Sequence, residues 1–246
     1  VSLRLAECDY FLRRYKEVRE DLKPWLEGAS RRAEARYFDL MTARATGRRD
    51  EYIALTRALV EAFPESSWAE DALDSLASMH TVNDEDEQAD AVYRELASRF
   101  PSGRHTARAQ WKIGWRAFRL RRYAEAANVF EAAALTFPRS DYRPSWLYWS
   151  AQARERLGDR AGADEGFRLA VTDYGNSYFG RLAAKALPSH GTRLPAAAPG
   201  AAVTGTRMSG SGTAGTAAGA PPGAGAPPTA DLIRWLIAIE MYDEAT

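Results

Sequence analysis

The chain repeats one short segment four times: Phe63-Pro64-Glu65-Ser66, Phe100-Pro101-Ser102-Gly103, Phe137-Pro138-Arg139-Ser140 and Tyr174-Gly175-Asn176-Ser177. The first residues of these segments lie 37 positions apart three times in succession. A fixed period of this length is typical of proteins built from stacked structural repeats. Proline cannot continue a helix, so each segment is predicted to end one helix and to begin the connection to the next.

Three further columns upstream of these segments agree in character. Eleven residues before each aromatic residue stand Tyr52, Ala89, Ala126 and Ala163. Seven residues before it stand Thr56, Tyr93, Phe130 and Phe167. Four residues before it stand Leu59, Leu96, Ala133 and Ala170. Steps of four and three residues place these columns on one face of a helix. Small and bulky residues alternate there, which favours close packing against a neighbouring helix. Each unit is therefore predicted to be a pair of antiparallel helices.

Helix boundaries are indicated by local signals. Ser67 with Glu70, and Asp84 with Glu87, have the spacing of capping boxes that open two successive helices. Gly47 and Gly158 fall at equivalent places between paired helices, where a positive φ is useful. The units are expected to stack as an α-solenoid.

One unit carries the residues of a known repeat. The run Tyr123-Ala124-Glu125-Ala126, followed by Phe130, Ala133 and Pro138, resembles the second helix of a tetratricopeptide repeat. Gly114 matches the glycine in the first helix of that motif. The resemblance implies an all-α, right-handed α-solenoid of tetratricopeptide-like helix pairs. The period of 37 is longer than usual for that family, and the extra residues fit between each proline and the next helix.

The chain divides into three predicted regions. Residues 1–187 form the helical solenoid, and residues 188–229 form a disordered, flexible linker with 11 Ala, 9 Gly and 7 Pro. A linker function and an insertion without a role both remain open for this segment. Residues 230–246 read as the start of a further, truncated repeat, because Tyr242-Asp243-Glu244-Ala245 repeats the opening of a second helix. We therefore expect the natural protein to be longer.

A second resemblance concerns the last complete unit. The segment from Tyr148 to Gly158, followed by the segment from Ser177 to Ala184, resembles the end of the helical region of soluble lytic murein transglycosylases. The chain departs from that pattern at Gln152-Ala153-Arg154 and at Phe179. The resemblance implies a periplasmic or cell-envelope protein whose partner is peptidoglycan. The family cleaves glycan strands without water and forms 1,6-anhydromuropeptides, so such a parent protein would be an enzyme.

The catalytic motif of that family is not found in this chain. The family uses one glutamic acid, in a Glu-Ser motif followed by Gly-Leu-Met-Gln, as general acid and then base. Glu65-Ser66 is the one tempting match, but it lies in the repeated turn and no Gly-Leu-Met-Gln follows. We predict no catalytic residue here, and a scaffold or substrate-channelling role for the helices. The alternative is a non-enzymatic tetratricopeptide protein that binds a protein or peptide in the envelope or the cytoplasm.

Composition narrows the remaining classes of function. The 33 basic and 33 acidic residues give a net charge of zero, which removes the electrostatic argument for a nucleic-acid or anionic-membrane protein. Cys8 is the single cysteine, so the chain has no internal disulfide. No apolar run is long enough to span a membrane. His80, His105 and His190 lack ligand spacing, so we predict neither a metal site nor a cofactor.

A basic run is the candidate binding surface. Between Arg104 and Arg122 lie seven Arg or Lys and no acidic residue. Helical spacing interleaves cations with tryptophans, and the candidate substrate-binding residues are Arg108, Trp111, Lys112, Trp115, Arg116 and Arg119. They would suit an anionic or sugar-bearing polymer. The competing interpretation is a solvated arginine face opposite a tryptophan core, with the charges balanced by residues 84–87.

Overall fold

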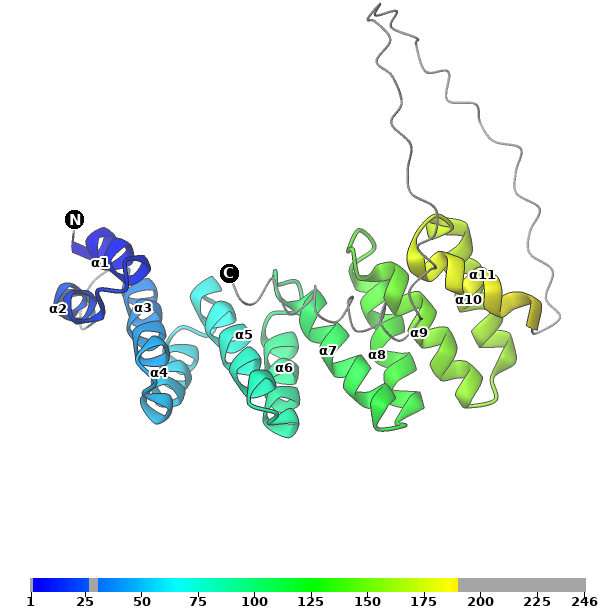
Figure 1. Cartoon of the computed structure of the whole chain (residues 1–246), viewed down its shortest axis with the longest axis horizontal. Coiled ribbons are helices and arrows are strands. Elements are labelled where there is room, and N and C mark those ends of the chain that lie inside the picture. The colour runs from blue at the N-terminus through cyan, green and yellow to red at the C-terminus, as the bar shows by residue number, and fades with distance from the viewer. Residues whose placement is uncertain (1, 27–30, 190–246) are drawn as a thin grey trace, which may run out of the picture. The chain divides into compact units, whose positions relative to one another are not determined.

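The computed structural model describes residues 2–26 and 31–189. This part of the chain contains eleven α-helices and no strand (Figure 1). The helices are α1 (Ser2–Phe11), α2 (Tyr15–Leu26), α3 (Arg32–Ala45), α4 (Arg49–Ala62), α5 (Ser67–Val82), α6 (Asp86–Arg99), α7 (Thr106–Arg119), α8 (Tyr123–Thr136), α9 (Arg143–Arg156), α10 (Arg160–Tyr174) and α11 (Tyr178–Ser189).

Successive helices pack against each other in chain order, which gives the pairs α1–α2, α3–α4, α5–α6, α7–α8 and α9–α10. First helices also contact the first helices of neighbouring pairs, as α3 contacts α5 and α9 contacts α11. The prediction of an all-α solenoid of tetratricopeptide-like helix pairs is confirmed. Each pair buries its apolar faces only by stacking on the next pair, as expected for a repeat protein.

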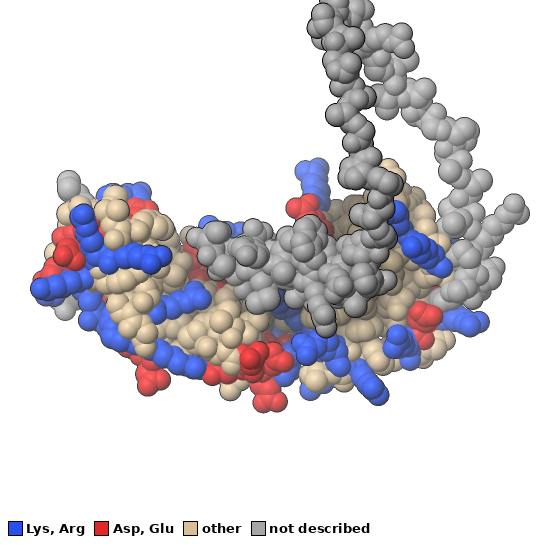
Figure 2. Space-filling view, viewed as in Figure 1, with Lys and Arg blue, Asp and Glu red and all other residues tan. Residues whose placement is uncertain are grey.

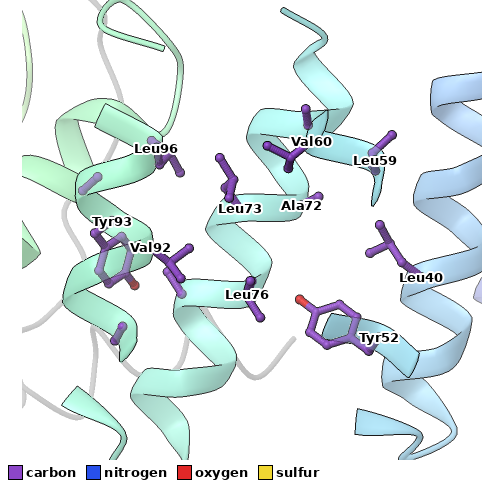
Figure 3. Packing of buried hydrophobic residues seen from close by; sticks show 14 of the residues in the cluster. Leu40, Tyr52, Leu59, Val60, Ala72, Leu73, Leu76, Val92, Tyr93 and Leu96 are labelled. Carbon is purple, nitrogen blue, oxygen red and sulfur yellow. The ribbon is translucent and has the colours of Figure 1, made fainter. Parts of the chain in front are cut away.

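The three columns found in the sequence form the buried faces of the second helices. Every member of the three columns is buried, including the polar Thr56, whose hydroxyl donates to the Tyr52 carbonyl at 2.8 Å. Figure 3 shows Tyr52, Tyr93 and Leu96 meeting side chains of the neighbouring first helices. A Cβ on Gly114 would lie 2.4 Å from Cε1 of Phe130, so the glycine admits that ring against α7. The predicted match of Gly114 to the repeat motif therefore has a packing reason.

Serines of the repeated turn bond the backbone near the start of the following helix. Ser66 is the N-cap of α5, and its hydroxyl accepts a hydrogen bond from the Trp68 backbone N–H. Ser177 accepts from the backbone N–H of Gly180, whereas Ser140 accepts from the backbone N–H of Tyr142, which is itself the N-cap residue of α9. The capping box predicted at Ser67 and Glu70 is wrong by one residue, because the cap of α5 is Ser66. The Glu70 carboxylate instead accepts from the backbone N–H of His105, at 2.7 Å.

The turn inside each helix pair places one residue in the left-handed region. In the four pairs from α3 to α10 these residues are Gly47, Asp84, Arg121 and Gly158, with φ of 73°, 58°, 59° and 82°, and they lie 37 positions apart. Arg13, with φ of 60°, occupies this place between α1 and α2. The predicted cap at Asp84 is therefore wrong, since Asp84 occupies this turn position and α6 begins after Glu85. Glycine adopts such a φ without strain, whereas the other residues adopt it at some cost.

Helix α11 ends at Ser189, two residues past the predicted end of the solenoid at 187. The predicted linker over 190–229 and the predicted truncated repeat over 230–246 lie outside the described residues.

Candidate interaction surface on helix α7

Helix α7 lies where two apolar clusters meet. Ala109 and Ile113 belong to the cluster of α3–α6, and Ala117 belongs to the cluster of α8–α11. The candidate residues do not form one mixed face. Arg108 and Arg116 contact aspartates of the preceding pair, whereas Trp115 contacts Trp149 of the following pair.

Charged groups connect α5 to the start of α7. We call the set Asp71, Asp74, Arg104, His105 and Arg108 the ionic joint. Arg108 donates to both oxygens of Asp74, at 2.8 and 2.9 Å, and also contacts Ser78. His105 Nε2 lies 2.8 Å from Asp71 Oδ1, and His105 Nδ1 lies 3.6 Å from Asp74 Oδ2. Arg104 donates to the same Asp71 oxygen, at 2.9 Å.

The contacts of the ionic joint shift the pKa values of the groups within and beside it. Burial by itself would raise the pKa of Asp71, but hydrogen bonds from His105 and Arg104 outweigh it and lower the pKa. Burial would lower the pKa of His105, but the Asp71 hydrogen bond and the two aspartate charges raise it. Burial, with a smaller contribution from the Asp71 charge, raises the pKa of Tyr37 to about 12. The joint therefore favours charged His105 between charged aspartates.

Aromatic rings connect α7 to α9. We call the set Trp111, Trp115, Phe118, Tyr142 and Trp149 the aromatic joint. Trp111 and Trp115 stack with their ring centroids 5.8 Å apart, and Trp115 stacks on Phe118 at 6.0 Å. Trp149 meets Trp115 and Phe118 edge-to-face, at 4.8 and 4.9 Å. These are the separations at which aromatic pairs attract, and all five side chains remain half-buried.

The two joints occupy the same columns of the repeat. Tyr37, Asp74 and Trp111 are 37 positions apart, as are Trp68, His105 and Tyr142. The structure pairs Tyr37 with Trp68 at 5.0 Å and Trp111 with Tyr142 at 6.3 Å. Between them, Asp74 meets His105 instead. Sequence reasoning missed Asp71, Asp74 and His105, although aligning these columns would have shown the substitution of rings by charges.

The six candidate residues make different contacts in this arrangement. Arg108 belongs to the ionic joint, and Arg116 lies 3.8 Å from Asp90 of α6. The charge partners of these two arginines are thus Asp74 and Asp90, and the balance predicted from residues 84–87 is wrong. Trp111 and Trp115 belong to the aromatic joint. Within the described residues, half-buried Lys112 and exposed Arg119 form no ion pair.

The one tempting catalytic pair occupies a turn. Ser66 caps α5, and Glu65 is exposed between α4 and α5.

A pocket of about 360 Å³ opens between the second helices α8 and α10, above α9. Leu135, Leu147 and Leu169 line it, together with Arg143 and Arg154. Both arginines are engaged, Arg143 with Asp173 at 2.8 Å and Arg154 with Glu131 at 2.7 Å. The described helices offer no cluster of three or more metal-ligating side chains, and none of them is long and apolar enough to cross a bilayer.

Comparisons with known proteins agree with this architecture. A tetratricopeptide repeat family model matches residues 147–177, which cover most of α9 and α10. No curated protein matches the chain. The helix pairs and the family match make the chain a helical repeat protein of the tetratricopeptide type.

Several solved structures resemble the chain at low identity. MamA of AMB-1 is 17% identical, over 74% of this chain and 92% of that one, with a TM-score of 0.46. Yeast Tom70 is 16% identical, over 77% of this chain and 39% of that one, with a TM-score of 0.48. A thermophilic TPR protein of Thermus thermophilus is 18% identical, over 76% of this chain and 97% of that one, with a TM-score of 0.35.

Proposed function

We propose that the chain is a scaffold that binds a protein or peptide along its first helices. The observation that carries this proposal is the aromatic joint, whose rings stay half-buried although they pack on each other. Tryptophans that remain partly accessible are among the side chains that contribute most to the free energy of binding at protein interfaces. Lys112, which forms no ion pair among the described residues, adds a charge on the same helix.

Selection of a displayed peptide library on the full chain tests this proposal. Peptides are expected to be enriched. Trp115→Phe and Lys112→Gln are each expected to lower the affinity of the chain for these peptides about tenfold. Trp115→Phe keeps a ring in the joint, so the fold is retained and circular dichroism should not change. Arg57→Gln, on α4, is the control because Arg57 is already paired with Glu95. Absence of enrichment, or equal binding by both variants and the parent chain, would exclude this function.

A more specific second function is favoured by the segment that resembles lytic transglycosylases. It lies on α9, α10 and α11, and Tyr148 of α9 contacts Phe179 of α11 with 5.7 Å between ring centroids. The two halves of the resembling pattern therefore pack together. On this proposal the helices hold a downstream catalytic domain in the periplasm and limit which glycan strands reach it.

Two measurements separate this second function from the first. The natural sequence downstream of Thr246 should contain Glu-Ser followed by Gly-Leu-Met-Gln, and a protein that ends soon after Thr246 contradicts it. The chain itself should bind purified peptidoglycan without cleaving it. Release of anhydromuropeptides by this chain, with loss on Glu65→Gln, would mean that the catalytic acid lies here instead.

A further inference from the structure

The turns inside the helix pairs form an edge of the solenoid on which charge is segregated. The turn between α5 and α6 carries Asp84, Glu85 and Asp86, whereas the turn between α7 and α8 carries Arg119, Arg121 and Arg122. In Figure 2 the lower margin changes from red beneath α5 and α6 to blue beneath α7 and α8. The net charge of zero therefore hides two patches of opposite sign.

Exposed arginines remain in the two later turns. Arg49, in the turn between α3 and α4, is instead paired with Glu85 in the turn between α5 and α6, at 2.6 Å. Arg119, Arg121, Arg156 and Arg160 are exposed and form no ion pair with any described residue. The turn between α9 and α10 also carries Glu155 and Asp159, and Asp159 is paired with Arg154 at 3.1 Å. Arg122 reaches only Glu125, at 3.8 Å.

A leucine projects at the tip of each basic turn. In the four pairs from α3 to α10, the residue after the first helix is Thr46, Asn83, Leu120 or Leu157. Leu120 and Leu157 are 47% and 50% exposed, in positions where the two preceding turns carry polar side chains. Leu12, in the turn between α1 and α2, is also exposed, at 60%. Exposed leucines next to arginines are the combination of side chains that binds the interface of an anionic bilayer.

We propose that the edge formed by the α7–α8 and α9–α10 turns docks on an anionic lipid surface. Each arginine near the membrane surface is attracted by the phosphate headgroups of anionic lipids and lowers the free energy of membrane binding. A leucine side chain strengthens binding only where it is removed from water. The acyl layer of a bilayer removes it from water, and a soluble polyanion does not. The leucines therefore favour a bilayer over nucleic acid or another charged polymer. This inference is independent of the proposed protein-binding role.

Sedimentation of the full chain with lipid vesicles tests the proposal. The chain should bind vesicles of phosphatidylcholine mixed with phosphatidylglycerol and should not bind phosphatidylcholine alone. Arg119→Gln and Arg156→Gln should each lower the partition coefficient about fivefold. Arg121→Gly should do the same, and it cannot strain the turn because Gly47 and Gly158 occupy the equivalent positions. Leu120→Thr with Leu157→Thr should lower the partition coefficient about tenfold.

Controls assign the effect to this edge. Arg57→Gln with Arg99→Gln removes two charges from positions paired with Glu95 and should leave vesicle binding within twofold of the parent chain. An equal loss in this control would mean that net charge alone drives binding. Unchanged binding by the leucine variant, with displacement of the chain by heparin, would assign the edge to a soluble polyanion. Either result overturns the proposal, as does a failure to bind anionic vesicles.

Discussion

The ionic joint and the aromatic joint solve the same structural problem with opposite chemistry. Each connects the first helices of neighbouring pairs through the same repeat columns, with Asp74 and His105 in one and Trp111 and Tyr142 in the other. Rings attract without titrating and with little dependence on salt, whereas charges depend on both. A repeat fold can therefore vary the strength and the pH response of one joint while it keeps its backbone geometry.

The largest expected effect comes from the aromatic joint. Trp115→Ala removes contacts to Trp111, Phe118 and Trp149, and is expected to lower the free energy of unfolding by about 2–3 kcal/mol, because the ring is only half-buried. Urea denaturation followed by circular dichroism measures it. Leu135→Ala is the control, since Leu135 is 82% exposed and should change stability by less than about 0.5 kcal/mol. Equal losses of unfolding free energy in both variants would mean that the ring contacts of the aromatic joint stabilise the chain no more than an exposed side chain does.

Removal of one charge from the ionic joint should cost less. Asp74→Asn removes the carboxylate that Arg108 and His105 share, although His105 keeps Asp71, and is expected to destabilise the chain by about 1–2 kcal/mol, between the values for exposed and buried pairs. The same denaturation assay applies, with Glu61→Gln on exposed α4 surface as the control. A loss as large as that of Trp115→Ala would contradict this ranking of the two joints.

A pH dependence is expected at the ionic joint. His105 has a raised pKa in the folded chain, so its stabilisation is full below the unfolded pKa and is lost as pH rises through the folded pKa. Asp71 has a lowered pKa, so its contribution is lost as pH falls through that value. Stability should be greatest between these two limits.

Hydrogen exchange, corrected for intrinsic rates, measures this response. Exchange at the start of α7 should accelerate from mildly acidic to mildly alkaline pH, while exchange in α9 should not change. His105→Gln should remove the difference. If that variant retains the same pH profile, His105 is not the responsible group.

The smallest expected effect is that of salt. Raising the ionic strength to about 1 M shortens the screening length to about 3 Å, so partly exposed charges attract less. Exchange at the ionic joint should increase slightly, and the aromatic joint should be unaffected. The double variant Asp74→Trp with His105→Tyr places the residues of the following repeat in this joint and should reduce the salt response, while the Arg104–Asp71 pair remains. An undiminished response in the double variant would mean that Asp74 and His105 do not contribute to it.

Much of the fold could be predicted because repeats make the evidence redundant. Four Phe-Pro-like segments and three columns gave independent indications of the same helix pair, and all twelve column residues are buried. The predicted caps failed because Ser66 and Ser67 are both good capping residues, and the choice depends on where the turn leaves the backbone. Asp84 misled for a related reason, since aspartate suits both a cap and a left-handed turn.

The candidate surface was predicted less well than the fold. Sequence spacing brought Arg108, Trp111, Lys112, Trp115, Arg116 and Arg119 onto one helix, which is right. It could not assign their partners, because Asp74 and Trp149 lie on different neighbouring helices. Helical periodicity relates residues of one helix, whereas ion pairs and ring contacts between helices depend on how the pairs stack.

The sequence by itself determined the 37-residue period, the pairing of helices and the faces they bury, because these follow from local spacing and from the need to cover apolar columns. Only the tertiary structure decided that Arg108 and Arg116 of α7 contact the preceding pair and that Trp115 contacts the following pair. It also gathered the unpaired arginines and exposed leucines of two turns on one edge. Both outcomes depend on the stacking of successive pairs, which sets the distances between residues that are far apart in the chain.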